Sequence, residues 1–203
     1  MATGELVSME ALARWQKSDG TFVSPEEFIP LFESSGFITR FDMYIWKSVC
    51  KTLAAWQDKG CKLVPISINV SMIDITNIDV PQYLSMLTEQ YHISPEYLPV
   101  EITESVFAES NTIVKNTITR FHKKGFYVLM DDFGSGYSSL NVLKDANVDY
   151  LKLDMKFMQI DAKNKGKGIQ ILKSIVDMAH RLNLVKNARS EERFSRNAET
   201  DLV

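Results

Sequence analysis

Two adjacent carboxylates, Asp131 and Asp132, carry the strongest chemical signal in the sequence. They follow an uninterrupted apolar run, residues 126–130, and precede a glycine-rich turn at 133–136. An Asp-Asp pair before glycine also occurs in ordinary turns. At the end of a strand, however, the chain is leaving the sheet, so both carboxylates can face a pair of cations. We therefore interpret the two residues as part of a metal site.

Polar side chains also close the other predicted strands. In chain order, the set is Glu10, Asn69, Glu101, Asp131 and Lys152. Its four oxygen-bearing members suit Mg²⁺ or Mn²⁺ rather than zinc, which favours nitrogen and sulfur ligands. The histidines do not extend the set, because each lies in or beside a predicted helix and is expected at the surface or at a helix end: His92, His122 and His180.

Two cationic side chains fit the same chemistry. Lys152 closes the last predicted strand and, if directed at the metal site, would orient a nucleophilic water or neutralise phosphate charge. A salt bridge from Lys152 to Asp131 or Asp132 is the simpler alternative, and both roles are compatible. Arg14, four residues after Glu10, is a candidate phosphate ligand, with an ordinary surface arginine as an equal alternative.

The elements that must position these residues alternate between short apolar runs and amphipathic stretches. Strands are predicted within residues 5–15, 63–70, 98–103, 126–130 and 150–153. Later helices are predicted at residues 81–91, 111–124 and 168–182. Apolar strands separated by helices indicate a parallel sheet that helices cover on at least one face.

The spacing of the strand-end residues indicates the kind of sheet. The steps from Asn69 to Glu101, Asp131 and Lys152 are 32, 30 and 21 residues, or about one strand–helix unit each. Polar residues at successive strand ends are typical of a (β/α)8 TIM barrel, whose active site lies at the carboxyl-end mouth. Only about five of its eight strands are visible. The sequence therefore predicts an α/β fold of the TIM-barrel type that is incomplete in this chain.

Local signals delimit two helices near the N-terminus. Ser24 is predicted to be the N-cap of a short helix, with Pro25 at the first helical position and Glu27 completing a capping box. Gly36 ends this helix. A longer helix is predicted over residues 40–59, closed by a glycine and apolar along one face: Ile45, Val49, Leu53 and Trp56.

The composition is that of an ordinary globular chain. Its 203 residues are 45% hydrophobic and 24% charged, with a net charge of −3, which excludes disorder, collagen and a disulfide scaffold. The slightly negative net charge gives no sign of the basic surface that binds a nucleic-acid polymer. We see neither a membrane segment nor a signal peptide. Cys50 and Cys61 match no metal spacing and are predicted to be buried, reduced thiols.

The residues alone point to metal-assisted chemistry on a phosphate ester. Two cations about 3.5–4 Å apart can clamp the attacking and leaving oxygens of an in-line displacement. These patterns leave the substrate open.

Several motifs in a fixed order make the chain resemble the EAL-domain family of cyclic di-GMP phosphodiesterases. They are Glu10-Ala11-Leu12 followed by Arg14-Trp15, SPEEFIPLFESSGFI, SINVS with Asn69, EITES with Glu101, DDFGSGYSSL, and LKLD with Lys152. The match covers residues 4–184. The resemblance implies a modified TIM barrel and hydrolysis of cyclic di-GMP (c-di-GMP) to linear pGpG, dependent on two Mg²⁺ or Mn²⁺ ions.

The resemblance also implies a role for each matching residue. The metal pair would be bound by Glu10, Asn69, Glu101, Asp131 and Asp132. Asp132 would bind the second ion and belong to the catalytic residues, and Lys152 would position the attacking water. Arg14 would contact a substrate phosphate. Glu104 would hold the loop 132–138, which in this family couples metal binding to dimerisation; a solvent-facing strand residue is the alternative for Glu104.

The chain departs from the family pattern at both ends. It starts after the family's first strand, which contains Gln-Pro, and it lacks a strand close to Ala-Glu-Gly-Val-Glu near residue 188. The first glutamate of that strand belongs to the family's active site. Glu191 and Glu192 do not replace it, because their surroundings are polar and show no strand pattern. We therefore expect a partial EAL domain over residues 1–188, with impaired activity.

Residues 189–203 are predicted to be a non-native tail. The segment RSEERFSRNAETD, residues 189–201, back-translates with ordinary codons into a widely used sequencing adapter. A natural charged tail is the alternative reading, and finding these codons in genomic DNA would establish it.

Two other functions stay open at this point. One is a catalytically inactive EAL module that binds c-di-GMP or a partner protein; the retained metal ligands argue against it. The other is a TIM-type metalloenzyme that acts on a different phosphodiester. The expected partners are c-di-GMP and, for the full-length family, a second copy in a homodimer. We expect a cytoplasmic location, while membrane anchorage of the parent protein is left open.

Overall fold

The computed structural model describes residues 6–109, 111–134, 143, 146–153, 170, 173–175, 177–179 and 181–182. The chain divides into two compact units, one within Met1–Val100 and the other within Glu101–Glu191. Several predicted features lie outside the described residues: the loop after Gly134, much of the helix over 168–182, and the tail 189–203.

A five-stranded sheet carries the polar residues singled out above. Its strands follow the order β1-β4-β5-β6-β7, with the bounds Met9–Glu10, Ile66–Asn69, Val100–Thr103, Val128–Phe133 and Tyr150–Leu153. β1 is parallel to β4, with Met9 opposite Ile66, and β6 is parallel to β7, with Leu129 opposite Tyr150. The four strands predicted after residue 60 are confirmed, with boundaries shifted by up to three residues.

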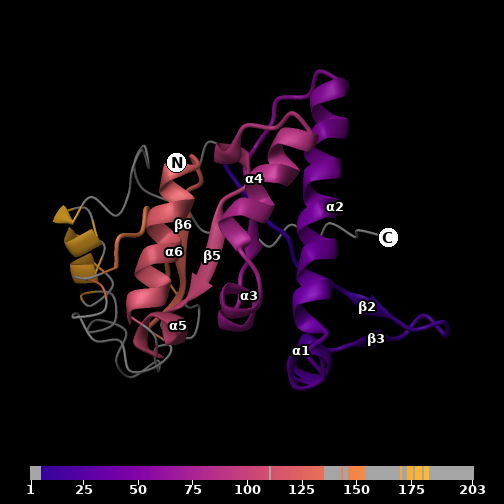
Figure 1. The fold of residues 1–203 in the computed structure, drawn as a ribbon, viewed down its shortest axis with the longest axis horizontal. Helices are drawn as coiled ribbons and strands as arrows, with labels where there is room; N and C mark the ends of the chain where they lie inside the picture. Colours follow the sequence, from indigo (N-terminus) through magenta and orange to yellow (C-terminus); the bar gives the residue numbers. More distant parts are fainter. Residues whose placement is uncertain are drawn as a thin grey trace. The chain divides into compact units, whose positions relative to one another are not determined.

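The prediction of a strand followed by a loop within residues 5–15 is confirmed by β1 and the coil at 11–14, and the hairpin that begins at Trp15 was not predicted. β2 (Trp15–Gln16) pairs antiparallel with β3 (Phe22–Val23), and Figure 1 shows this hairpin next to α1. In its turn, the side chain of Asp19 accepts a backbone amide at 2.9 Å, and Gly20 has a φ of 85°. Asp-Gly is a strong hairpin signal, so this pair could have predicted the turn.

Helix α1 (Pro25–Ser34) begins where the sequence predicts, after the N-cap Ser24. The Oγ atom of Ser24 accepts the amide of Glu26 at 3.3 Å. The predicted capping box with Glu27 is wrong, because the hydroxyl bonds the second residue of the helix and not the third.

Helix α2 (Ile38–Asp58) confirms the long predicted helix. Of the predicted apolar face, Val49 and Leu53 are buried, while Ile45 and Trp56 are half-buried. The buried side of α2 also includes Trp46. The start of α2 packs on α1 through aromatic rings, with centroid distances of 5.9 Å for Phe28–Phe41 and 5.2 Å for Phe32–Phe41.

Between β4 and β5, the first unit contains helices α3 (Met72–Asn77) and α4 (Val80–Gln90) and the short 3₁₀ helix η1 (Pro95–Tyr97). The prediction of α4 is confirmed, whereas α3 was missed. A capping box starts α3: the Ser71 hydroxyl accepts the Asp74 amide, and the Asp74 carboxylate accepts the Ser71 amide. A Ser-x-x-Asp pattern signals such a helix start.

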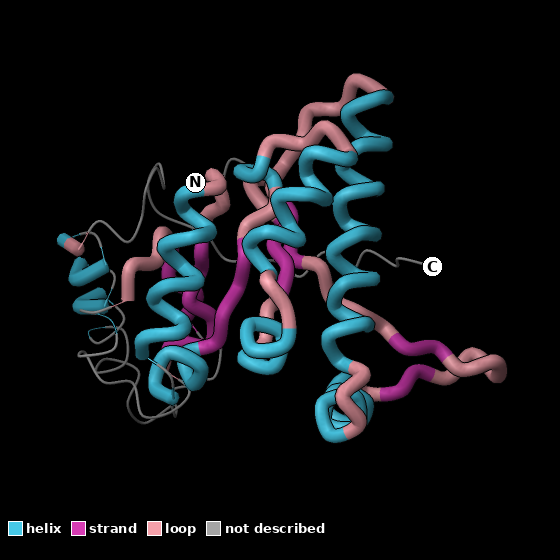
Figure 2. Tube along the Cα trace, in the orientation of Figure 1, coloured by secondary structure: helices cyan, strands magenta, loops and turns pink. Residues whose placement is uncertain are grey.

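The second unit contributes α5 (Glu104–Glu109) and α6 (Asn111–Lys123). The prediction of α6 is confirmed, and α5 was missed because it follows β5 without a turn signal. Figure 2 shows both helices with the strands of their unit. α6 packs on β6, and the apolar residues buried there include Val114, Ile118, Phe121, Val128 and Met130.

The two cysteines have different surroundings. Cys50 is buried, as predicted, and burial raises the pKa of its thiol to about 12. Cys61 is exposed. The prediction of burial is therefore wrong for Cys61, which follows Gly60 in the loop after α2.

Within the described ranges, no helix is long and apolar enough to cross a membrane. The longest helix, α2, has 21 residues and carries charged side chains along its exposed side.

Candidate metal centre and catalytic site

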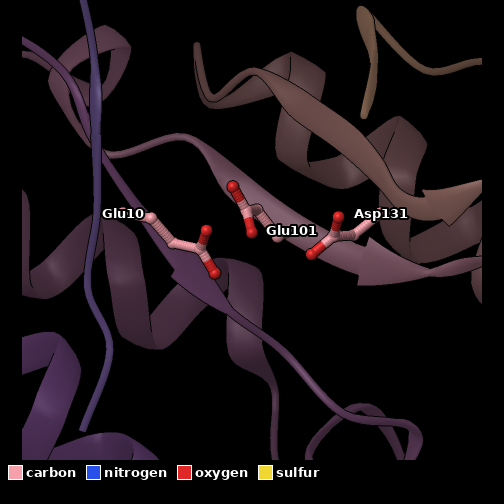
Figure 3. Close-up of side chains that lie close together, drawn as sticks. All are labelled: Glu10, Glu101 and Asp131. Carbon is pink, nitrogen blue, oxygen red and sulfur yellow. The ribbon is translucent and has the colours of Figure 1, made fainter. Parts of the chain in front are cut away.

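Glu101, Asp131 and Lys152 form a charged cluster in the second unit. The Lys152 Nζ atom donates to Glu101 Oε2 at 2.6 Å and to Asp131 Oδ2 at 3.1 Å. A carboxylate oxygen of Glu101 lies within 4.8 Å of one of Asp131, and Figure 3 shows these two side chains. Glu101 is only 1% exposed, whereas Asp131 and Lys152 are half-buried. Three neighbouring strands, β5, β6 and β7, thus supply the cluster.

The cluster keeps a net negative charge, because one ammonium group compensates two carboxylates. A carboxylate as buried as that of Glu101 requires a cationic or hydrogen-bonding partner. Within the second unit, Glu101 and Asp131 can each offer a carboxylate oxygen to a metal ion (Figure 3). Oxygen donors and residual negative charge are what Mg²⁺ and Mn²⁺ prefer. The donor set therefore fits a hard divalent cation.

Asp131 and Asp132 occupy a break in the pairing of β6 with β7. The register shifts between Met130 and Phe133, and Asp132 has a φ of 56°. Aspartate is one of the few side chains that tolerate this left-handed conformation. The Asp132 amide donates to Asp131 Oδ1 at 2.8 Å, and Asp132 is exposed. This irregularity releases the pair from strict alternation between the two faces of the sheet.

Glu104 is the first residue of α5 and is buried, with 5% exposure. Its Oε2 atom accepts the amide of Gly134 at 3.1 Å. Gly134 has a φ of 98°, which a side-chain-bearing residue would adopt only with strain. Glu104 therefore contacts the segment that follows the Asp131-Asp132 pair.

In the first unit, Glu10 and Asn69 end the neighbouring strands β1 and β4. The Asn69 amide donates to Glu10 Oε1 at 3.4 Å, a long hydrogen bond. The main chain of Asn69 is fixed by a shorter bond, because the buried Trp46 indole donates to its carbonyl oxygen at 3.0 Å. Arg14 is exposed and donates to the adjacent carbonyl of Ala13 at 3.1 Å.

The expectation that every polar residue closes its strand is only partly right. Glu10 and Asn69 are the last residues of β1 and β4. Glu101 is the second residue of β5, and Asp131 and Lys152 lie inside β6 and β7. β6 and β7 continue past their polar residues, and Phe133 pairs with Leu153 beyond the irregularity.

Beside Asn69, the first unit contains a pair of carboxyl groups that the sequence did not reveal. Asp74 is fully buried, and its Oδ2 atom accepts both the amide and the hydroxyl of Ser71, at 2.9 and 2.7 Å. Asp42 of α2 lies close to it. Burial, followed by the negative charge of Asp74, raises the pKa of Asp42 to about 8. At neutral pH, Asp42 therefore carries a proton that it can share with Asp74.

A buried carboxylate in the second unit was also missed. Asp149 precedes β7 and is 3% exposed. It accepts a hydrogen bond from His122, at 2.8 Å. The prediction of a helix-end position for His122 is right, since it lies in the last turn of α6. The only sequence signal for Asp149 was an acidic residue directly before an apolar strand.

The chain matches the EAL domain family over residues 1–185. It belongs to this family.

Curated relatives carry names that state an activity. The chain is 35% identical over 185 residues to the probable cyclic di-GMP phosphodiesterase PdeB of Escherichia coli K12, covering 91% of this chain and 34% of that protein. It is 33% identical over 183 residues to the cyclic di-GMP phosphodiesterase PdeR of the same strain, covering 89% of this chain and 27% of that protein. The chain thus spans about a third or less of the length of these relatives.

Solved structures agree with this assignment. The PaMucR phosphodiesterase in complex with c-di-GMP matches with a TM-score of 0.80 and 26% identity, covering 89% of this chain and 72% of that one. The EAL enzyme Bd1971, bound to cAMP and c-di-GMP, matches with a TM-score of 0.80 and 25% identity, covering 90% of this chain and 50% of that one. The fold is therefore TIM-barrel-like, and the five parallel strands described here are consistent with an incomplete barrel.

Proposed function

We propose that this chain is the phosphodiesterase domain of a bacterial signalling protein and hydrolyses c-di-GMP to linear pGpG. The observation that carries the proposal is the cluster of Lys152 with Glu101 and Asp131, at 2.6 and 3.1 Å. It brings a cation and two carboxylates together in a member of the EAL family. The named activities of PdeB and PdeR support the same reaction.

The metal set proposed for this reaction is the one that the family resemblance implies: Glu10, Asn69, Glu101, Asp131 and Asp132. The order of the strands supports it, because β1, β4, β5 and β6 are neighbours in one sheet and parallel strands share a carboxyl edge. Two Mg²⁺ or Mn²⁺ ions held there would supply Lewis acidity and a nucleophilic water near neutral pH.

Three further side chains have roles in this proposal, and Lys152 is the one shown above to contact the set. Lys152 would hold the attacking water by hydrogen bonding, next to the carboxylates of Glu101 and Asp131 to which it donates. Glu104, by accepting the Gly134 amide, ties α5 to the segment after Asp132. Arg14 is exposed, so its guanidinium can reach a substrate phosphate.

Assembly and location follow the family in this proposal. The full-length protein would form a homodimer, with Glu104 coupling metal binding to the interface, and would act in the cytoplasm.

Residues 1–188 would form the partial EAL domain, which the family match over residues 1–185 supports. Residues 189–203 would be translated adapter, and sequencing the source DNA past codon 188 tests this: genomic codons for the tail contradict it.

The proposal is tested by incubating the full chain with c-di-GMP and either Mg²⁺ or Mn²⁺ and measuring pGpG by chromatography. We expect turnover that is impaired, because the chain departs from the family pattern near residue 188, and that Glu101→Gln lowers by about a further 100-fold, because it removes a charged metal ligand. Glu96→Gln is the matched control, since Glu96 is exposed and lies in η1. Binding of c-di-GMP without turnover would contradict the proposal and favour an inactive binding module.

A further inference from the structure

Asp149 makes an unusual set of contacts for a residue just outside a strand. Its Oδ2 atom accepts the Val128 amide at 2.9 Å and a hydrogen bond from His122 Nε2 at 2.8 Å. Its own amide donates to the Val128 carbonyl at 2.8 Å. Asp149 therefore binds both backbone groups of the first residue of β6.

The tautomer of His122 agrees with this arrangement. Nδ1 of His122 lies 3.4 Å from the side-chain nitrogen of Asn147, which can only donate. A carboxylate can only accept, so His122 Nε2 is the donor in the bond to Asp149. The carboxylate is thus held by two donors, one from β6 and one from the end of α6.

The strand that follows Asp149 needs such a constraint. β7 has four residues, Tyr-Leu-Lys-Leu, and all four side chains are half-buried. Burial alone therefore does not distinguish one face of β7 from the other. A slip of one residue against β6 would move every side chain of β7 to the opposite face. Lys152 would then lose Glu101 and Asp131.

The irregularity in β6 makes the correct register harder to hold. Tyr150 and Leu151 pair with Leu129 and Met130, but the pairing then shifts before Leu153 meets Phe133. Lys152 lies in the shifted part, so the regular ladder before it is only two pairs long. The bonds between Asp149 and Val128 extend this ladder at the end opposite the shift.

We propose that Asp149 is a positioning residue for the phosphodiesterase reaction: it fixes the register of β7 against β6 and thereby places Lys152 between Glu101 and Asp131. The inference deepens the proposed function and rests on it for its kinetic test. The contacts of Asp149 described above go to β6 and α6, and it acts on the reaction through Lys152.

Three variants of the full chain separate this role from general stability. Asp149→Ala removes the acceptor, and we expect kcat to fall at least about 10-fold with KM for c-di-GMP within about threefold of wild type. Asp149→Asn keeps an oxygen for the Val128 amide and should restore kcat to within about threefold. His122→Ala removes the link to α6 but leaves the bond to Val128, so its kcat should also stay within about threefold.

The proposal is overturned if Asp149→Ala keeps a wild-type kcat, or if His122→Ala loses as much activity. If Asp149→Ala does not fold, Asp149→Leu replaces it, because leucine fills the volume without offering an acceptor. Combining the acceptor-free variant with Lys152→Met gives the sharpest comparison. Lys152→Met alone and the double variant should have the same kcat, since both have lost the same lysine; a further 10-fold loss would contradict the inference.

A second measurement separates failure of this inference from failure of the proposed function. The coupling free energy between Lys152 and Glu101 is obtained from urea unfolding of both single variants and the double variant. It should be present with Asp149 and lost in the Asp149→Ala background. If wild type does not hydrolyse c-di-GMP but this coupling depends on Asp149, the reaction is wrong and the register role stands. Coupling that survives Asp149→Ala overturns the register role.

Discussion

The two units hold their polar residues in different ways. In the first unit, neutral side chains bond to the main chain: the Trp46 indole donates to the Asn69 carbonyl at 3.0 Å, and the Ser71 hydroxyl accepts the Asp74 amide at the start of α3. In the second unit, charged partners act on the side chains, with Lys152 bonded to Glu101 and Asp131 at 2.6 and 3.1 Å.

The difference matters because neutral and charged contacts respond differently to change. A neutral hydrogen bond contributes about 1 kcal/mol, and its loss is local. A buried carboxylate that loses its cation is left with an uncompensated charge, which costs several times more. The stability of the second unit should therefore be sensitive to the removal of a single charge. The stability of the first unit should instead depend on pH, through the proton that Asp42 shares with Asp74. Three experiments test this contrast.

The largest effect is expected for Lys152→Met in the second unit. It leaves Glu101, 1% exposed, without its closest cation, and we expect the free energy of unfolding to fall by about 2–3 kcal/mol. The estimate lies below that for fully buried pairs because the Lys152 side chain is 26% exposed. Urea unfolding measures it, with the exposed Lys173→Met as the matched control. Equal stability of the two variants would show that the pair contributes no more than a surface ion pair.

The pH dependence of the first unit should follow Asp42. Its pKa of about 8 lies above the ordinary value of 3.8, so the folded chain keeps a proton that the unfolded chain releases between these values. This contribution to stability therefore falls as pH rises from about 4 to about 8, with a limiting slope of about 1.4 kcal/mol per pH unit. Because Asp42 is only half-buried, we expect a total change of about 1–2 kcal/mol.

Asp42→Asn isolates this proton, because the amide supplies a permanent donor to Asp74. Urea unfolding at intervals from pH 5 to 9 should show a weaker decline for Asp42→Asn than for wild type. The control is Asp58→Asn, at the exposed end of the same helix. Parallel curves for Asp42→Asn and wild type would exclude the shared proton.

The smallest effect is expected for the helix caps of the first unit. Ser71→Ala removes the capping box of α3 and should cost about 1 kcal/mol. Ser24→Ala should cost about 0.5 kcal/mol, since the Ser24 hydroxyl makes one bond of 3.3 Å to the Glu26 amide. Thermal unfolding of both variants tests the order, and a larger loss for Ser24→Ala would reverse it.

Much of the fold was predictable because its signals are local. The apolar run before Asp131 and the run 150–153 predicted β6 and β7, and Ser24-Pro25 predicted the start of α1. The elements that were not predicted are short or have no turn residue before them. Helices α3 and α5 have six residues each, and α5 follows β5 directly.

The candidate site was predictable as a set of residue types but not as a set of contacts. Nothing in the spacing of Glu101 and Lys152 indicates that they share a hydrogen bond of 2.6 Å. The buried acids Asp74 and Asp149 look like ordinary turn residues in the sequence, since each stands beside the start of a helix or strand. Their burial depends on residues far along the chain.

The sequence by itself therefore determined the family, the strands of the parallel sheet with the longer helices between them, and the oxygen-rich side chains available for a metal, because motifs and periodicity are properties of neighbouring residues. Only the tertiary structure decided which carboxylates Lys152 bonds to, that Asp42 keeps its proton, and how β7 is aligned on β6. These outcomes depend on distance and burial, and a one-residue shift in register would change them while leaving every sequence signal intact.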